Sequence, residues 1–212
     1  MPRTARIVLP GIAHHITQRG NNKQTVFYDD EDHHRYLSLL AHYAPLHRLR
    51  ILAYCLMPNH VHIVGVPAEE NSLAKAIGRT HMQYTIHFQQ KYHVHGHLWQ
   101  SRFYSCPMDE EHTINALAYV ELNPVRAGFL TTPWEYPWSS APPHCTTSVS
   151  SAVLNLERWR SRFTTEYWQD FLRSSLGKND FCETIREYSR SGKPMGNAVF
   201  LKRVKEILSK RK

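Results

Sequence analysis

Short stretches with the period of a strand alternate with longer stretches that have the period of a helix. Strands are predicted where apolar and polar residues alternate or form a short apolar run: 14–20, 48–57, 60–67 and 96–108, the last being a strand or a hairpin. Helices are predicted where apolar residues recur three and four positions apart: 29–46, 72–93 and 109–124. The tight turn at Pro58 and Asn59 makes the two middle strands antiparallel. This mixed order predicts an α+β fold, with a central antiparallel sheet and helices packed on it.

The C-terminal part differs from the rest in charge. Residues 1–149 carry a net charge of +1 and residues 150–212 carry +7, and the stretch 140–152 between them is rich in Pro, Ser and Thr. Helical patterns recur at 159–176 and 198–209. We therefore predict one domain over 1–145 and a basic helical C-terminal extension over 146–212. The extension either contacts DNA or packs on the first domain through aromatic residues: Trp159, Phe163, Trp168 and Phe171.

The composition favours an anionic partner. The chain of 212 residues has a formal net charge of +8, a balance that is common in proteins that bind nucleic acid. Its 15 histidines and 11 tyrosines supply groups that bind metals, transfer protons or stack on bases. The four cysteines form no C-x-x-C pair, which argues against a zinc knuckle or a disulfide framework. Without an evident signal peptide or membrane span, we expect a soluble protein of the reducing cytoplasm, associated with the nucleoid.

Two histidines stand inside the apolar stretch CLMPNHVHIVGVP, residues 55–67. Side chains alternate faces along a strand, so His60 and His62 point the same way, about 7 Å apart. Two imidazoles at this spacing can converge on one metal ion. The alternative is a pair of half-exposed histidines on an ordinary sheet, which is the commoner outcome for an isolated H-x-H.

The helix predicted at 109–124 supplies a second set of polar groups. Asn115, Tyr119 and Asn123 are four residues apart and therefore line up beside the apolar face of the helix. If that side meets the histidines, two imidazoles, an amide oxygen and a phenol gather in one place. A metal ion held there could polarise a phosphodiester that Tyr119 attacks. The alternatives are a tyrosine at the rim of the core and an asparagine that ends the helix before Pro124.

Five motifs in register give these residues a family context. MPNHVHIV at 57–64 resembles the histidine–hydrophobe–histidine (HUH) strand of the single-tyrosine HUH transposases, and YVELNPVRAG at 119–128 resembles their catalytic-tyrosine helix. ITQRGNN at 16–22, GHLWQSRF at 96–103 and YPWSS at 136–140 match the same group. The likeness covers about residues 5–142, and it is closest to the REP-associated tyrosine transposases of bacteria.

The resemblance implies a ferredoxin-like HUH nuclease that cuts single-stranded DNA near hairpins and leaves a 5′-phosphotyrosine link. It makes Tyr119 the nucleophile and His60 and His62 ligands of Mg²⁺ or Mn²⁺. Many relatives have Gln as third ligand four residues after the tyrosine, where this chain has the shorter Asn123. Relatives include monomers as well as dimers that share the tyrosine helix. Candidate DNA contacts lie in or beside the motifs and in the basic end of the chain: Arg19, Asn21, Asn22, Arg102, Arg126, Lys202 and Arg203.

Other functions are open at this point. A hairpin-DNA-binding regulator that has lost cleavage would share the fold but need neither the metal nor the tyrosine. A metal-dependent hydrolase of small phosphate esters would need no basic extension. HVHGH at 93–97 lies between a helix and a strand, where metal binding is the less favoured interpretation. The acidic run at 29–32 is better explained as the cap and first turn of a helix than as a metal site.

Overall fold

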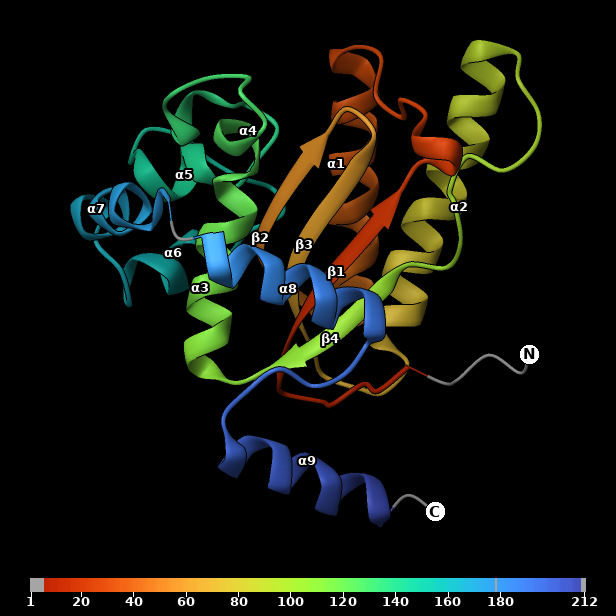
Figure 1. Cartoon of the computed structure of the whole chain (residues 1–212). Coiled ribbons are helices and arrows are strands. Elements are labelled where there is room, and N and C mark those ends of the chain that lie inside the picture. The colour runs from red at the N-terminus through yellow and green to blue at the C-terminus, as the bar shows by residue number, and fades with distance from the viewer. Residues whose placement is uncertain (1–5, 178, 211–212) are drawn as a thin grey trace.

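The computed structural model describes residues 6–177 and 179–210, and its centre is a four-stranded sheet (Figure 1). The elements in chain order are β1 Ala13–Arg19, η1 Asn21–Lys23, α1 Asp30–Leu46, β2 Leu49–Met57, β3 His60–Pro67, α2 Ser72–Tyr92, β4 Tyr104–Met108, α3 Glu110–Glu121, α4 Asn123–Arg126, η2 Pro133–Glu135, α5 Ala141–Cys145, α6 Leu156–Arg160, α7 Thr165–Ser175, α8 Asn179–Ser191 and α9 Ala198–Ser209. The strands lie in the order β2-β3-β1-β4, and each neighbouring pair is antiparallel. This is the split βαβ arrangement of ferredoxin-like folds, so the predicted α+β sheet is confirmed.

Helices α1 and α2 cover one face of the sheet (Figure 1). The chain enters α1 through Asp29, whose side chain accepts a hydrogen bond of 3.0 Å from the backbone N–H of Asp32. The acidic run is therefore a helix start, as predicted. The core on this face is aromatic and aliphatic, with Tyr36, Tyr84 and Ile63 fully buried.

The opposite face carries α3 and the C-terminal helices, and α8 runs across the front of the sheet in Figure 1. One buried cluster joins strand residues with side chains of α3 and of the extension, among them Trp159, Phe163 and Trp168. Packing through these aromatic residues is what the second interpretation of the extension predicted. The division at residue 145 stays a prediction.

Glu121 fixes α3 to the extension. Its side chain has no exposed surface and accepts hydrogen bonds from Ser140 Oγ at 2.6 Å, His144 Nδ1 at 2.6 Å and Trp168 Nε1 at 2.7 Å. A buried carboxyl group is stable only with such partners. The angle of α3 over the sheet is therefore set partly by residues far along the chain.

The segment 96–108 differs from the prediction of a strand or hairpin over its full length. Only Tyr104–Met108 forms a strand. The part before it is a loop with one isolated bridge between Gly20 and Trp99. Leu98 and Phe103 are buried in the core on the α1 and α2 face, so the apolar pattern here reflects anchoring of a loop and not strand pairing.

The helix predicted at 109–124 is α3, and it ends at Glu121, close to Pro124 as predicted. The helix breaks at Leu122, and Pro124 then stands in the first turn of the short α4. A proline is tolerated there because the first N–H groups of a helix have no intrahelical partner.

The helical patterns of the extension are partly right. The helix at Ala198–Ser209 is present, while the pattern at 159–176 is split into α6 and α7, because Thr164 caps α7 with a hydrogen bond from Tyr167 N–H. Helix α8 was not predicted at all. No helix in the described residues has the length and apolar character to cross a membrane.

Candidate active site

His60 and His62 lie on the face of the sheet that α3 and α8 cover. Strand β3 pairs with β1 so that His62 is opposite Thr17 and His60 is opposite Arg19. The two imidazole rings are 4.9 Å apart between centroids, in an edge-to-face arrangement. The shared strand face therefore does bring the pair together.

Tyr119 reaches the histidines from α3. Its ring centroid is 5.5 Å from that of His62 and 5.8 Å from that of His15, and only 4% of the residue is exposed. Asn123 follows one turn later and is also buried. All of these residues line one cleft of about 660 Å³. The structure thus brings together the two imidazoles, the phenol and the amide that the sequence proposed.

A hydrogen-bond chain fixes the tautomer of His62. Ser189 Oγ of α8 donates to Ile185 O at 2.6 Å, so it accepts from His15 Nδ1, also at 2.6 Å. Burial lowers the pKa of His15 to about 3, so the ring is neutral and its Nε2 is an acceptor. That Nε2 is 2.9 Å from His62 Nδ1, which must carry the proton. The Nε2 of His62 is left with its lone pair.

His60 reaches the same state through a different neighbour. The Asn59 amide donates from Nδ2 to Lys23 O at 3.2 Å, which turns its Oδ1 toward His60 Nδ1 at 2.6 Å. The Nδ1 of His60 therefore donates. Burial, and after it the charges of Arg19 and Arg186, lower the pKa of His60 to about 4. His60 also presents an unprotonated Nε2.

These tautomers fit a divalent metal ion. A metal binds the lone pair of a neutral imidazole, and a hydrogen bond from the other ring nitrogen orients the ligand. Burial first, then the neighbouring His60 and His15, hold the pKa of His62 well below its usual range. In the described residues no group of three or more His, Cys, Asp and Glu side chains is placed to hold a metal. A third protein ligand would therefore come from another residue type.

Asn123 is the candidate third ligand, and it also caps α3. Its Nδ2 donates to Tyr119 O at 3.0 Å and to Val120 O at 3.3 Å. This orientation commits the amide nitrogen to the helix end and leaves Oδ1 for another partner. The predicted role as a ligand and the alternative role as a helix end are therefore compatible.

Two arginines surround Tyr119. Arg186 Nε of α8 is 3.4 Å from the phenol oxygen, and the guanidinium of Arg126 lies over the ring, 4.4 Å from its centroid. Arg126 also donates from its terminal nitrogen to the backbone oxygen of Tyr119. Positive charge beside the phenol oxygen favours a negatively charged nucleophile or the anionic phosphate that it attacks.

The proposed DNA-contacting residues do not gather at one place. Arg19 and Arg126 line the cleft. Asn21 and Asn22 lie in the turn η1, and Arg102 is exposed in the loop before β4, all outside the residues that line it. Lys202 and Arg203 lie on α9, and Arg203 lines a different cavity. These assignments stay predictions.

The sequence interpretation missed three residues of the cleft, His15, Arg186 and Ser189. His15 was included only in the strand predicted at 14–20, although its position on β1 puts it on the same face as Thr17 and Arg19. The other two belong to the unpredicted α8. Apolar positions at Phe181, Cys182, Ile185 and Tyr188 were a usable signal for that helix.

Comparison with known proteins agrees with this geometry. A family model described as "Transposase IS200 like" matches residues 9–123, which is more than half of the chain. A Haemophilus influenzae protein provisionally assigned as a REP-associated tyrosine transposase is 29% identical over 101 residues, or 42% of this chain and 57% of that protein. The match spans little more than half of that relative.

Two solved structures are also similar. The structure of a REP-associated tyrosine transposase bound to a REP hairpin has a TM-score of 0.55 at 15% identity, over 72% of this chain and 90% of that chain. A provisionally assigned transposase from Deinococcus radiodurans gives a TM-score of 0.40 at 20% identity, over 57% of this chain and 96% of that chain, which is too weak for an argument. The resemblance found in the motifs is confirmed, and the chain belongs to the IS200-like transposase family.

Proposed function

We propose that this transposase is a metal-dependent single-stranded DNA endonuclease and strand transferase that acts on hairpin DNA through Tyr119. The observation that carries the proposal is that the Tyr119 phenol lines one cleft with His60 and His62, whose Nδ1 atoms both have hydrogen-bond partners within the protein. Family membership adds a DNA substrate. The relative whose structure is similar is bound to a REP hairpin, which supports a hairpin as the substrate here.

The proposed reaction is a transesterification. The phenol oxygen of Tyr119 attacks phosphorus, the bond from phosphorus to the 3′ oxygen breaks, and a 5′-phosphotyrosine link forms. Tyr119 loses its proton and the leaving 3′ oxygen takes one up. No ATP is consumed, because the phosphotyrosine link replaces the phosphodiester bond that is broken. The reverse attack by another 3′-hydroxyl would transfer the strand.

The chain's own residues have separate parts in this reaction. His60, His62 and Asn123 would hold Mg²⁺ or Mn²⁺, which, when bound, would neutralise charge on the phosphate oxygens. Arg186 stabilises negative charge at the phenol oxygen. Arg126 and Asn123 hold the backbone of α3 at Tyr119, so that the ring stays in place as the DNA binds.

The decisive experiment is covalent capture of DNA. A labelled single-stranded hairpin is incubated with the protein and Mn²⁺, and the protein–DNA adduct is separated on a denaturing gel. Tyr119→Phe should reduce the adduct to background while hairpin affinity stays within about 2-fold, because only the nucleophilic oxygen is removed. Tyr104→Phe is the matched control, since Tyr104 lines the same cleft but is 42% exposed.

Either of two results would decide against the assignment. An adduct that persists in Tyr119→Phe assigns the nucleophile elsewhere. Tight hairpin binding by the wild type without any adduct favours the alternative, a DNA-binding regulator without cleavage. A mixture of Tyr119→Phe and His62→Ala chains tests whether one chain is sufficient. Because the phenol and the histidines meet within one chain here, the mixture should not recover activity.

A further inference from the structure

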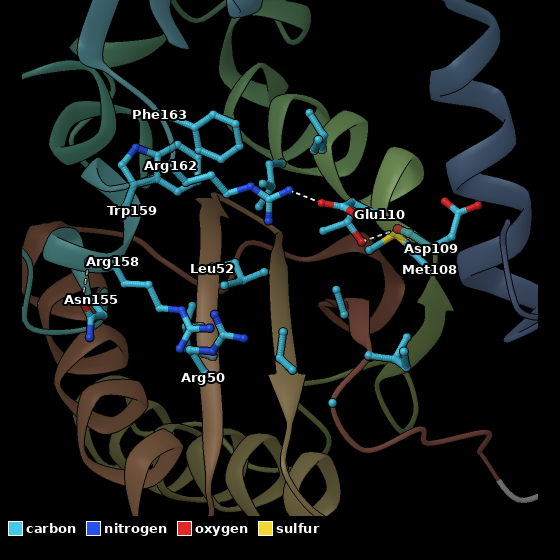
Figure 2. A pocket seen from close by; sticks show the side chains of 18 of the residues that line it. Arg50, Leu52, Met108, Asp109, Glu110, Asn155, Arg158, Trp159, Arg162 and Phe163 are labelled. Carbon is cyan, nitrogen blue, oxygen red and sulfur yellow. Dashed lines mark hydrogen bonds and ion pairs between the residues drawn. The ribbon is translucent and has the colours of Figure 1, made fainter. Parts of the chain in front are cut away.

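A second cavity of about 570 Å³ lies at the other end of α3, and Figure 2 shows its walls. The N-terminal half of α3 borders it through Thr113, Ile114 and Leu117. Strand β2 borders it through Arg50, and the C-terminal extension closes it with α6 and α9. Its volume is within the range of ligand-binding cavities.

Arginine side chains from distant parts of the sequence meet in this cavity, which we call the arginine groove: Arg50, Arg158, Arg162 and Arg203. Three of the four come from the basic extension. Arg50 and Arg158 approach each other in Figure 2, and the charge of Arg158 contributes, after burial, to lowering the pKa of Arg50. Arg50 is half-buried and Arg158 is exposed, and the repulsion between two like charges at close range favours the binding of an anion beside them.

Among the described residues, an anionic side chain pairs with one arginine of the groove. Glu110 forms an ion pair with Arg162, drawn as a dashed line in Figure 2. Asp109 is engaged elsewhere, accepting from His112 and from the backbone N–H of Asn197. Within residues 6–177 and 179–210, Arg50 and Arg158 form no ion pair.

Local structure holds both arginines in place. Arg50 is opposite Val66 in the sheet, next to an irregularity in pairing between Ile51 and Ala53. Such a bulge re-aims side chains at the edge of a sheet. Arg158 lies in the first turn of α6, where its backbone N–H donates to the Asn155 cap at 2.9 Å. The two guanidinium groups are therefore presented by structured backbone.

An aromatic wall stands beside the two arginines. Trp159 stacks on His144 with ring centroids 3.6 Å apart, and Phe163 follows 4.7 Å from Trp159. Both aromatic residues line the groove. Two neighbouring guanidinium groups next to an apolar wall suit a phosphate joined to an apolar sugar edge, because the guanidinium fork matches phosphate oxygens.

We propose that the arginine groove binds the phosphate backbone of DNA whose scissile phosphate is held at Tyr119. The inference rests on the proposed function for the identity of the polyanion. Helix α3 has 12 residues, and at 1.5 Å per residue its ends are roughly 18 Å apart. That span corresponds to about five steps of duplex DNA at 3.4 Å each. The groove would therefore contact DNA several nucleotides from the cut.

The test compares Arg50→Gln/Arg158→Gln with the wild type in equilibrium binding across a range of salt concentrations. Two labelled DNAs are used, a bare hairpin and the same hairpin with ten extra nucleotides on each side. On the long DNA the slope of log K against log salt should become shallower by roughly 1.4 to 1.8, since each phosphate contact contributes about 0.7 on single-stranded DNA and about 0.9 on duplex DNA. Affinity for the bare hairpin should change less.

Lys75→Gln/Arg79→Gln is the matched control. It removes the same charge from exposed positions of α2, on the opposite face of the sheet. Its salt slope should stay near that of the wild type. Arg158→Gln alone changes an exposed side chain and is the second variant, for use if the double variant fails to fold. An unchanged slope in a folded Arg158→Gln or double variant overturns the proposal.

A further experiment tests whether the arginine groove binds free phosphate and not DNA. If inorganic phosphate raises the melting temperature of the wild type but not of the double variant, while DNA binding is the same in both, the groove takes a small anion and the DNA proposal is wrong. The adduct assay separates the two proposals. At saturating DNA the double variant should form the Tyr119 adduct at the wild-type level. If the wild type forms no adduct but DNA binding depends on the groove, only the catalytic proposal fails.

Discussion

The two cavities at the ends of α3 differ in whether their polar side chains have partners within the protein. In the catalytic cleft each key side chain already has a partner within the protein: His62 has His15, His60 has Asn59, and Tyr119 has Arg186. In the arginine groove, Arg50 and Arg158 have no counter-charge among the described residues. The cleft is organised before a ligand arrives, whereas the groove is completed by one.

This difference matches what the two places have to do. Chemistry at phosphorus depends on donors and ligands fixed within fractions of an ångström, and internal hydrogen bonds provide that. Holding a backbone phosphate requires charge but tolerates movement. The comparison predicts that substitutions in the cleft act on metal binding and reaction, and that substitutions in the groove act on affinity and its salt dependence.

The largest effect is expected from a substitution that loosens α3, because residues of α3 line both cavities. Glu121→Ala leaves the buried donors His144 Nδ1 and Trp168 Nε1 without an acceptor, and it leaves Ser140 Oγ only its longer hydrogen bond to Tyr54 O. Its free energy of unfolding should fall by about 3 kcal/mol or more, measured by urea denaturation. Glu111→Ala removes an exposed carboxylate from the first turn of the same helix and should change it by less than about 1 kcal/mol. Equal stability of the two variants would show that the junction does not hold α3.

Removal of a proposed metal ligand comes next. His62→Ala should lower Mn²⁺ affinity by more than about 100-fold, because loss of a ligand exceeds the 10–100-fold cost of losing an outer partner. The free Mn²⁺ signal in electron paramagnetic resonance measures this without DNA. His95→Ala, in the exposed loop at 93–97, is the histidine control. Mn²⁺ affinity that is the same in both variants would exclude a metal at the HUH strand.

The sequence predicted the residues of β3 and α3 in the site better than it predicted His15 and Ser189, and the reason is physical. Strand alternation places His60 and His62 on one face, and helix periodicity aligns Tyr119 with Asn123, so these pairs are encoded within a few residues. His15 and Ser189 are 174 positions apart, and their contact depends on how α8 packs. No local pattern carries that information.

The arginine groove could not be predicted from the sequence for the same reason. The sequence predicted a basic extension, and its charge is indeed in residues 150–212. It could not show that Arg158 would lie beside Arg50 of a strand, because that depends on the packing of Trp159 and Phe163 against the α3 face. The antiparallel pairing of the two middle strands, in contrast, followed from the turn at Pro58.

A smaller effect is expected from Ser189, which is the outer end of the hydrogen-bond chain from Ser189 through His15 to His62. Ser189→Ala removes the acceptor of His15 Nδ1–H and with it the constraint that fixes the tautomer of His62. Mn²⁺ affinity should fall about 10-fold, and nitrogen-15 spectra of the histidines should show mixed tautomers at His62. Ser191→Ala is the control, since Ser191 also donates to a backbone oxygen of α8 but is exposed. A single tautomer of His62 in Ser189→Ala would show that this hydrogen-bond chain does not fix the tautomer.

The smallest effect is expected at Asn123. The direction in which Mn²⁺ affinity changes there distinguishes a metal ligand from a helix cap. Asn123→Ala loses both the amide oxygen and the bonds from Nδ2 to the backbone of α3. Mn²⁺ affinity should fall only about 3-fold, because water can replace the oxygen ligand. Asn123→Asp keeps an oxygen at that position, adds negative charge and still loses the Nδ2 donor. If the oxygen is a ligand, Asp should raise Mn²⁺ affinity above the wild type although it weakens the helix end. If Asn123 serves only as a cap, Asp and Ala should both leave Mn²⁺ affinity unchanged and lower stability alone.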